Sequence, residues 1–190
     1  MKFEDLMIER SIDRAEEAEI LENRFIAIRN RDRLQNAQKV IEQNAQKAFE
    51  QNAHRKETIT RFRGVYFVND SKSENINSTY FCMNTVGSNV VWIAGGNDAQ
   101  VNYQELVSLA SQKVKALICI GNNNTRLVET FEQHIPIIFQ CNDMEEAVRK
   151  AFYAAQQGDT VLLSTASPCD NRFENYQERG NAFKKAIAQL

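Results

Sequence analysis

The sequence is short of the residues that build metal and redox sites. It has 2 histidines and 4 cysteines in 190 residues, and no two cysteines form a C-x-x-C pair. Such pairs and clusters of histidine are the usual signs of zinc binding or thiol redox chemistry, so no metal site is predicted. The cysteines lie far apart along the chain, at Cys82, Cys119, Cys141 and Cys169. Cys119 lies in the apolar run ALICI and is predicted to be a small core residue.

Long hydrophobic runs are also absent. No apolar stretch approaches the roughly 20 residues that span a bilayer. The first 19 residues are too acidic for a secretory leader. We therefore expect a cytoplasmic chain without a membrane partner. The net charge of −2 and the pI of about 5.8 give no reason to expect nucleic acid as a partner either.

Two motifs of enzyme chemistry are missing as well. The chain contains no G-x-x-x-x-G-K-[ST] phosphate loop and no G-x-S-x-G nucleophile elbow. Ser164, Ser167 and Cys169 occur in the run STASPCD, but the sequence places no histidine base beside them. No catalytic residue is predicted.

Glycine and proline are absent from the first 63 residues, whereas the remaining 127 contain all 7 glycines and both prolines. The segment 1–50 is rich in Glu, Arg, Gln, Ala and Lys, which favour helices. Apolar residues, among them Phe25 and Ile28, recur there at helical spacing. We predict a helical N-terminal segment. It either docks on a partner protein or a second copy of the chain, or packs back on its own domain.

From Gly64 onward, apolar runs alternate with amphipathic stretches. Strands are expected at 64–70, 89–96, 114–121, 135–140 and 159–164, and helices at 75–86, 103–112, 125–133, 144–157 (with Asp143 as N-cap) and 173–190. This pattern predicts one α/β domain over residues 51–190, with a Rossmann-like, doubly wound, mainly parallel sheet. Ligands of such sheets bind beyond the carboxyl ends of the strands. Functional residues are therefore expected in the loops NDSK, GGND, GNNN, QCND and STASPCDN.

The NDSK loop is the most informative of these. Asp70 and Lys72 stand together at a strand end, just before a predicted helix. A helix N-terminus attracts anions, so this loop suits contacts to a nucleotide or a phosphate. The alternative is a surface ion pair with an N-cap.

Several motifs occur in an order that resembles a known family. They are His54-Arg55, GVYFVNDSK (64–72), VVWIAGG (90–96), GDTVLLS (158–164) and FENYQERG (173–180). Together they resemble the C-terminal domain of the Mur ligases, and above all of the members that add D-glutamate (UDP-N-acetylmuramoyl-alanine–D-glutamate ligases, MurD). The resemblance extends from His54 to the end of the sequence.

The resemblance implies specific roles. The family joins D-glutamate to a UDP-linked peptidoglycan precursor, using ATP and magnesium through an acyl-phosphate. Arg55, Asp70 and Lys72 match positions that face the nucleotide in the family. Four positions that hold D-glutamate are altered: the family's Thr, Lys, Ser and Phe are here Glu74, Ala99, Cys169 and Tyr176.

The family also needs a domain with the phosphate loop and a domain for the UDP moiety, and the sequence resembles neither. The chain is therefore expected not to be a competent ligase alone, and to have a binding, regulatory or assembly role. The alternative is a subunit of a split ligase, closing on a separate ATP-binding domain with ATP or ADP and magnesium as cofactors. A third hypothesis is a nucleotide-binding regulatory domain. In each case, Arg55, Asp70 and Lys72 can instead persist as structural hydrogen bonds and ion pairs.

Overall fold

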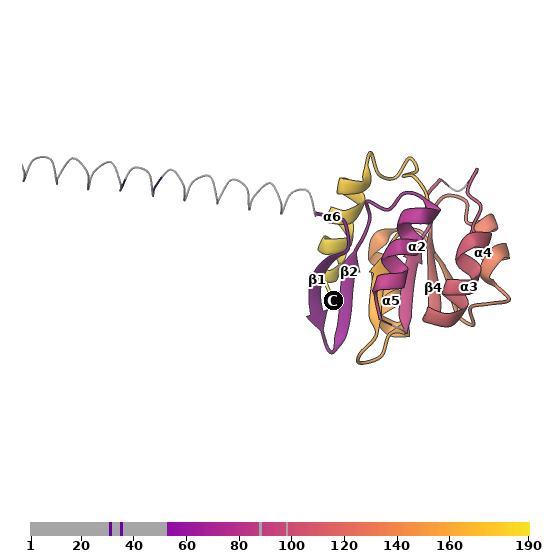
Figure 1. The fold of residues 1–190 in the computed structure, drawn as a ribbon, viewed down its shortest axis with the longest axis horizontal. Helices are drawn as coiled ribbons and strands as arrows, with labels where there is room; N and C mark the ends of the chain where they lie inside the picture. Colours follow the sequence, from indigo (N-terminus) through magenta and orange to yellow (C-terminus); the bar gives the residue numbers. More distant parts are fainter. Residues whose placement is uncertain (1–30, 32–34, 36–52, 88, 98) are drawn as a thin grey trace, which may run out of the picture. The chain divides into compact units, whose positions relative to one another are not determined.

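A computed structural model describes Arg31, Gln35 and residues 53–87, 89–97 and 99–190. The chain divides into two units, Met1–Gln51 and Asn52–Leu190, and all elements named below belong to the second (Figure 1). Arg31 and Gln35 are helical, and the rest of the predicted N-terminal segment lies outside the described residues. In the part of the chain that is described, no helix is long and apolar enough to cross a membrane.

A six-stranded sheet forms the centre of the second unit. Its strands, in the spatial order β1-β2-β6-β3-β4-β5, are β1 (Glu57–Phe62), β2 (Val65–Asn69), β6 (Thr160–Leu163), β3 (Val90–Ala94), β4 (Val114–Ile120) and β5 (Ile138–Cys141). β1 runs antiparallel to β2, and every other pair is parallel. The prediction of a mainly parallel sheet is confirmed. β6, which comes last in sequence, lies in the interior of the sheet.

Helices cover both faces of the sheet (Figure 1). They are α2 (Ile76–Thr85), α3 (Gln104–Lys113), α4 (Thr125–Phe131), α5 (Met144–Ala154) and α6 (Tyr176–Ile187). Side chains of α2, α3 and α4 contribute to one hydrophobic core, and those of α5 and α6 to the other. This arrangement confirms the predicted doubly wound fold.

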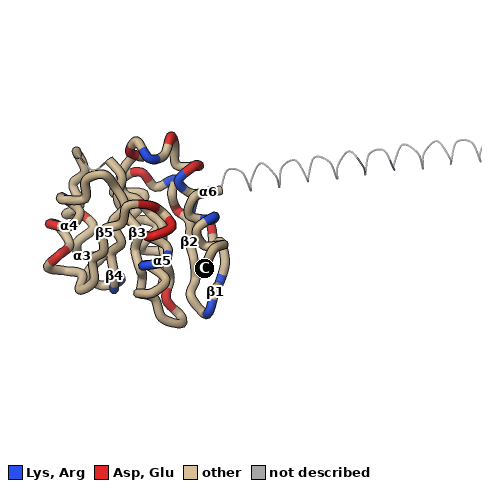
Figure 2. The backbone as a smooth tube through the Cα atoms, turned by 180° about the vertical axis from the view of Figure 1, so that it is seen from behind, with Lys and Arg blue, Asp and Glu red and all other residues tan. Residues whose placement is uncertain are grey.

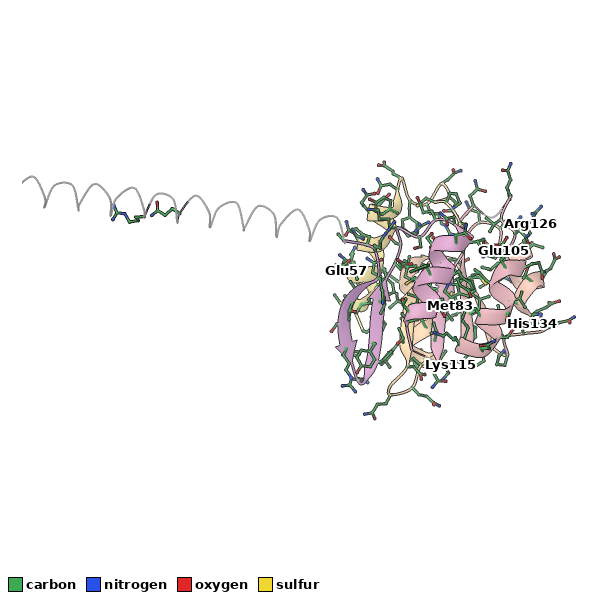
Figure 3. All side chains as sticks on the ribbon, in the orientation of Figure 1. Glu57, Met83, Glu105, Lys115, Arg126 and His134 are labelled. Atoms are coloured by element: carbon green, nitrogen blue, oxygen red, sulfur yellow. The ribbon has the colours of Figure 1, made fainter. Side chains whose placement is uncertain are left out.

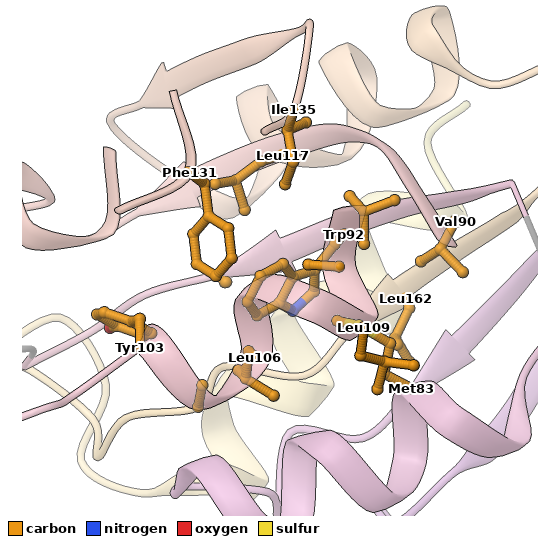
Figure 4. Close-up of a cluster of buried hydrophobic side chains, with 14 of the residues drawn as sticks. Met83, Val90, Trp92, Tyr103, Leu106, Leu109, Leu117, Phe131, Ile135 and Leu162 are labelled. Atoms are coloured by element: carbon orange, nitrogen blue, oxygen red, sulfur yellow. The ribbon is translucent and has the colours of Figure 1, made fainter. Parts of the chain in front are cut away.

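Alternation along the strands explains why there are two cores. On β3, Trp92 belongs to the core under α2, α3 and α4, whereas Val91 and Ile93 belong to the core under α5 and α6. Successive strand residues point to opposite faces, so a strand buried on both faces is apolar throughout. Trp92 packs edge-to-face on Phe131, with ring centroids 5.4 Å apart (Figure 4).

The sequence pattern missed β1. A register shift between Thr58 and Thr60 breaks the period-two alternation that identifies a half-buried strand. A two-residue turn at Arg63 and Gly64 joins β1 to β2, and both residues have positive φ, 46° and 84°. Positive φ at both turn residues is the backbone conformation that closes tight hairpins. β1 lies at the edge of the sheet.

Element ends differ from the predictions by a few residues. β5 begins at Ile138 rather than 135, α5 ends at Ala154 rather than 157, and α6 spans 176–187 rather than 173–190. Asp143 is confirmed as the N-cap of α5, because its side chain accepts a hydrogen bond from the backbone N–H of Glu146 (2.7 Å). α6 begins at Tyr176 rather than at the predicted residue 173, because Asn175 is its N-cap. The Asn175 side chain accepts a hydrogen bond from the backbone N–H of Glu178 (2.9 Å).

Candidate functional site

Three strand-end loops meet at the carboxyl edge of the sheet. The backbone N–H of Asp70 donates to the carbonyl of Leu163 (2.7 Å), and that of Ala166 donates to Ser73 (3.2 Å). The N–H of Gly95 donates to Thr165 (3.1 Å). The loops after β2, β3 and β6 are therefore one hydrogen-bonded unit, as the position of functional loops in parallel sheets predicts.

Asp70 lies in the interior of this unit, with only 1% of its surface exposed. Its Oδ2 accepts a hydrogen bond from Ser164 Oγ (2.8 Å), and its Oδ1 accepts one from the backbone N–H of Lys56 (3.0 Å). The alternative of a surface ion pair with an N-cap is wrong for Asp70, because Asn75 caps α2. Both carboxylate oxygens already have donors, so Asp70 holds the loops together.

Arg55 and Lys72 lie in different surroundings. The exposed Arg55 lines a cavity of about 780 Å³, together with Asp70 and Phe81. Lys72 does not line this cavity, and its Nζ stands 5.5 Å from the centre of the Tyr176 ring. Arg55 and Lys56 line the cavity and Lys72 stands beside Tyr176, so three cations near this edge can contact an anion such as a phosphate.

His54 anchors the segment that carries Arg55. It is buried, and its Nδ1 accepts a hydrogen bond from Asn69 Nδ2 (3.0 Å), so the proton of the neutral ring is on Nε2. Burial and the charge of Lys184 lower the pKa of His54 below its ordinary value. His54 is therefore a neutral structural residue at pH 7. The other histidine, His134, is exposed and lies beyond α4 (Figure 3).

Glu74 follows the NDSK loop, and its side chain contacts α6 and the loop after β6. Its Oε1 accepts a hydrogen bond from Arg179 Nη2 (3.2 Å) and one from Cys169 Sγ (3.4 Å). Burial raises the pKa of the Cys169 thiol to about 11, so the thiol is protonated and donates. A neutral thiol is a poor nucleophile. Cys169 also lines a separate cavity of about 250 Å³, together with Ala99 and Asp170.

Sequence reasoning missed Arg179. It is 1% exposed, and its Nη2 also donates to the carbonyl oxygen of Ser71 (2.6 Å). Burial lowers the pKa of this guanidinium, and the negative charge of Glu74 opposes that shift. Its neighbours Gln177 and Glu178 are exposed, so the local sequence reads as the solvent face of a helix. Its place in the FENYQERG motif was the signal that could have found it.

Candidate metal ligands are dispersed over the described part of the chain, where no three His, Cys, Asp or Glu side chains gather to hold an ion. Each carboxylate oxygen of Asp70 accepts one hydrogen bond. Acidic and basic residues both occur along the described backbone, in short groups of one sign (Figure 2).

Comparison with known proteins gives the family. A family model described as "Mur ligase, glutamate ligase domain" matches residues 54–167. The chain belongs to the Mur ligase family. It is 39% identical over 137 residues to UDP-N-acetylmuramoylalanine–D-glutamate ligases of Christiangramia forsetii and Porphyromonas gingivalis. These matches cover 72% of this chain and 31% and 30% of the relatives, so the chain spans about a third of their length.

Solved structures agree on the fold of this Mur ligase domain. A murein peptide ligase from Psychrobacter arcticus superposes with a TM-score of 0.50 at 8% sequence identity. The superposition covers 73% of this chain and 30% of that protein. At this identity the likeness concerns the fold alone.

The four altered positions of this Mur ligase domain gather around the same loops. Glu74 contacts Cys169, which shares a cavity with Ala99, and Tyr176 lies under the Lys72 ammonium. The resemblance assigned these positions to the incoming D-glutamate, and that role stays a prediction. The nucleotide-facing roles of Arg55, Asp70 and Lys72 stay predictions too.

Proposed function

We propose that this chain acts as a cytoplasmic binding and assembly domain of the Mur ligase type, and that it does not ligate D-glutamate by itself. One observation carries the proposal: the carboxylate of Glu74 lies against Arg179 and Cys169. In the family this position is a threonine that holds the amino acid. A negative charge therefore stands where a dicarboxylate has to bind.

The changes of charge at positions 74 and 99 support this conclusion. Relative to the family pattern, Glu74 adds a negative charge and Ala99 removes a positive one. A charge-assisted contact at an interface contributes about 1–3 kcal/mol, and a like-charge contact opposes binding by a similar amount. Two such changes are sufficient to weaken D-glutamate binding by orders of magnitude.

The alternative is a subunit of a split ATP-dependent ligase that closes on a separate ATP-binding domain. The cavity of about 780 Å³ beside Arg55 favours it, because a basic, partly apolar recess suits a nucleotide. Lys72 stands at the same edge. In that case ATP or ADP with magnesium is the cofactor, and Arg55 and Lys72 supply the contacts to its phosphates.

Isothermal titration separates these functions. We expect no saturable heat when D-glutamate is added to the intact chain, with or without magnesium–ATP, because Glu74 repels its carboxylates. Saturable D-glutamate binding would contradict the proposal. Heat from magnesium–ATP alone that disappears in Lys72→Ala, but not in the exposed control Lys185→Ala, would favour the split ligase.

Residues 1–50 supply the assembly part of the proposal. Apolar residues recur at helical spacing in this segment, which favours a partner protein or a second copy as the surface that covers them. We expect Phe25→Asp to abolish association in sedimentation velocity of the intact chain. Gln35→Asp adds the same charge at an exposed helical position and is expected to leave association unchanged. Equal sedimentation of both variants and the unsubstituted chain, with none of them associating, counts against self-assembly.

A further inference from the structure

The guanidinium of Arg179 is buried with only part of its hydrogen-bonding capacity used. Nη2 has two acceptors, the Ser71 carbonyl and Glu74 Oε1. Nε and Nη1 are buried and have no hydrogen-bond partner among the described residues. Arginine stays charged in proteins, and a buried charge without compensation is costly. The single carboxylate oxygen on Nη2 is therefore an important stabilising contact.

The space beside Arg179 cannot supply the missing partners. It is a small void lined by residues that include Gly95, Gly96 and Asp170, and it leaves no room for a water molecule. The Asp170 carboxylate forms its ion pair with Arg172 (3.0 Å). On the side of Glu74 the situation differs. The Glu74 side chain is 34% exposed, whereas that of Arg179 is 1% exposed. Glu74 is thus the partly exposed member of this ion pair, and Arg179 is the buried one.

We propose that Arg179 is the cationic anchor of a site for small carboxylates, and that the side chain of Glu74 occupies this site from within the chain. The inference deepens the proposed function and rests on it, since both place Glu74 where an external carboxylate would lie. The chain therefore carries the site in a filled state. An external carboxylate competes with Glu74 for it.

The donors around Glu74 fit a carboxylate. Oε1 receives the Arg179 N–H at 3.2 Å and the Cys169 S–H at 3.4 Å. Two donors that converge on one oxygen, one of them charged, are typical of carboxylate recognition. The thiol keeps its proton at neutral pH because burial raises the pKa of Cys169 to about 11. An external carboxylate at this place would meet the same two donors.

Truncation of Glu74 gives a direct test. Glu74→Ala removes a CH2–COO⁻ group, which has the heavy atoms of acetate, and opens a path from solvent to Arg179. We expect this variant to melt at a lower temperature than the unsubstituted chain in sodium chloride. Sodium acetate at the same ionic strength is expected to raise its melting temperature by about 3 °C or more, because a ligand stabilises the state that binds it.

Matched variants complete the experiment. Glu74→Gln fills the same space, and Glu129→Ala removes an exposed glutamate of α4, so neither is expected to show an acetate-specific shift. The inference is overturned if Glu74→Ala responds to acetate no more than these controls do. This outcome is distinct from failure of the proposed function, which is read from D-glutamate binding to the unsubstituted chain.

A second experiment applies if the Glu74→Ala variant does not fold in sodium chloride. In that case we expect this variant to refold in sodium acetate but not in sodium chloride. We also expect the double variant Glu74→Ala, Arg179→Met to fold without acetate, because the orphaned charge is gone. If neither acetate nor the second substitution restores folding, Arg179 is not the anchor and the inference is wrong.

Discussion

Gly180→Ala is expected to lower the free energy of unfolding by about 3 kcal/mol, although alanine favours helices. A Cβ at position 180 would lie 2.1 Å from His54 Nδ1, 2.8 Å from Ser71 Oγ and 2.9 Å from Asn69 Nδ2. His54 cannot easily move aside, because it is buried and hydrogen-bonded to Asn69. The new methyl group forces α6 away from the NDSK loop. Urea denaturation followed by circular dichroism measures the change.

Gly87→Ala is the matched control for this prediction. A Cβ at position 87 meets nothing within 4 Å, and the residue does not have a positive φ. We expect a change within about 0.5 kcal/mol there. A Gly180→Ala protein as stable as this control would show that α6 and the NDSK loop are not in the close contact described above.

Asp70→Ala is expected to destabilise the fold by about 3 kcal/mol in the absence of any nucleotide. The substitution removes the acceptor of the Lys56 backbone N–H and leaves Ser164 Oγ with Thr79 Oγ1 (3.0 Å) as its remaining acceptor. The loss of both hydrogen bonds to Asp70, together with the cavity left in a buried site, lowers stability. The midpoint of urea denaturation at constant m-value measures the effect.

The size of this effect tells apart the two roles considered for Asp70. Asp143→Ala, which removes the N-cap of α5, is the control and is expected to cost about 1 kcal/mol. A markedly larger loss for Asp70→Ala establishes a structural role. A loss of unfolding free energy no larger than that of Asp143→Ala would instead indicate that Asp70 is available to contact a ligand.

Patterns that depend on periodicity were readable from the sequence. Buried runs such as VVWIA (90–94) lie in the interior of a parallel sheet, where both faces are covered, so they identify their strands directly. The gathering of the NDSK and STASPCDN loops also followed from topology, since parallel strands bring their carboxyl ends to one edge. β1 was not readable, because its irregular register hides the alternation.

Features that depend on packing between distant segments were not readable. The environment of Asp70 is set by Lys56, which takes a positive φ of 45° and turns its N–H toward the carboxylate. Nothing in the local sequence around Asp70 indicates that donor. Arg179 is buried because α6 approaches the NDSK loop closely at Gly180, so a position with polar neighbours becomes an interior one. The contact between Glu74 and Cys169 joins residues 95 positions apart.

The interior position of β6 has a consequence for the synthesis of the protein. Residues 160–163 pair with β2 on one side and β3 on the other, and no other strand joins those two parts of the sheet. A nascent chain that has not reached this segment carries a β1-β2 hairpin and a β3-β4-β5 sheet, each with an unpaired edge. Unpaired edges invite pairing with other chains, and non-local pairing is slow. Protection from aggregation during translation therefore depends on how quickly residues 160–163 emerge and close the sheet.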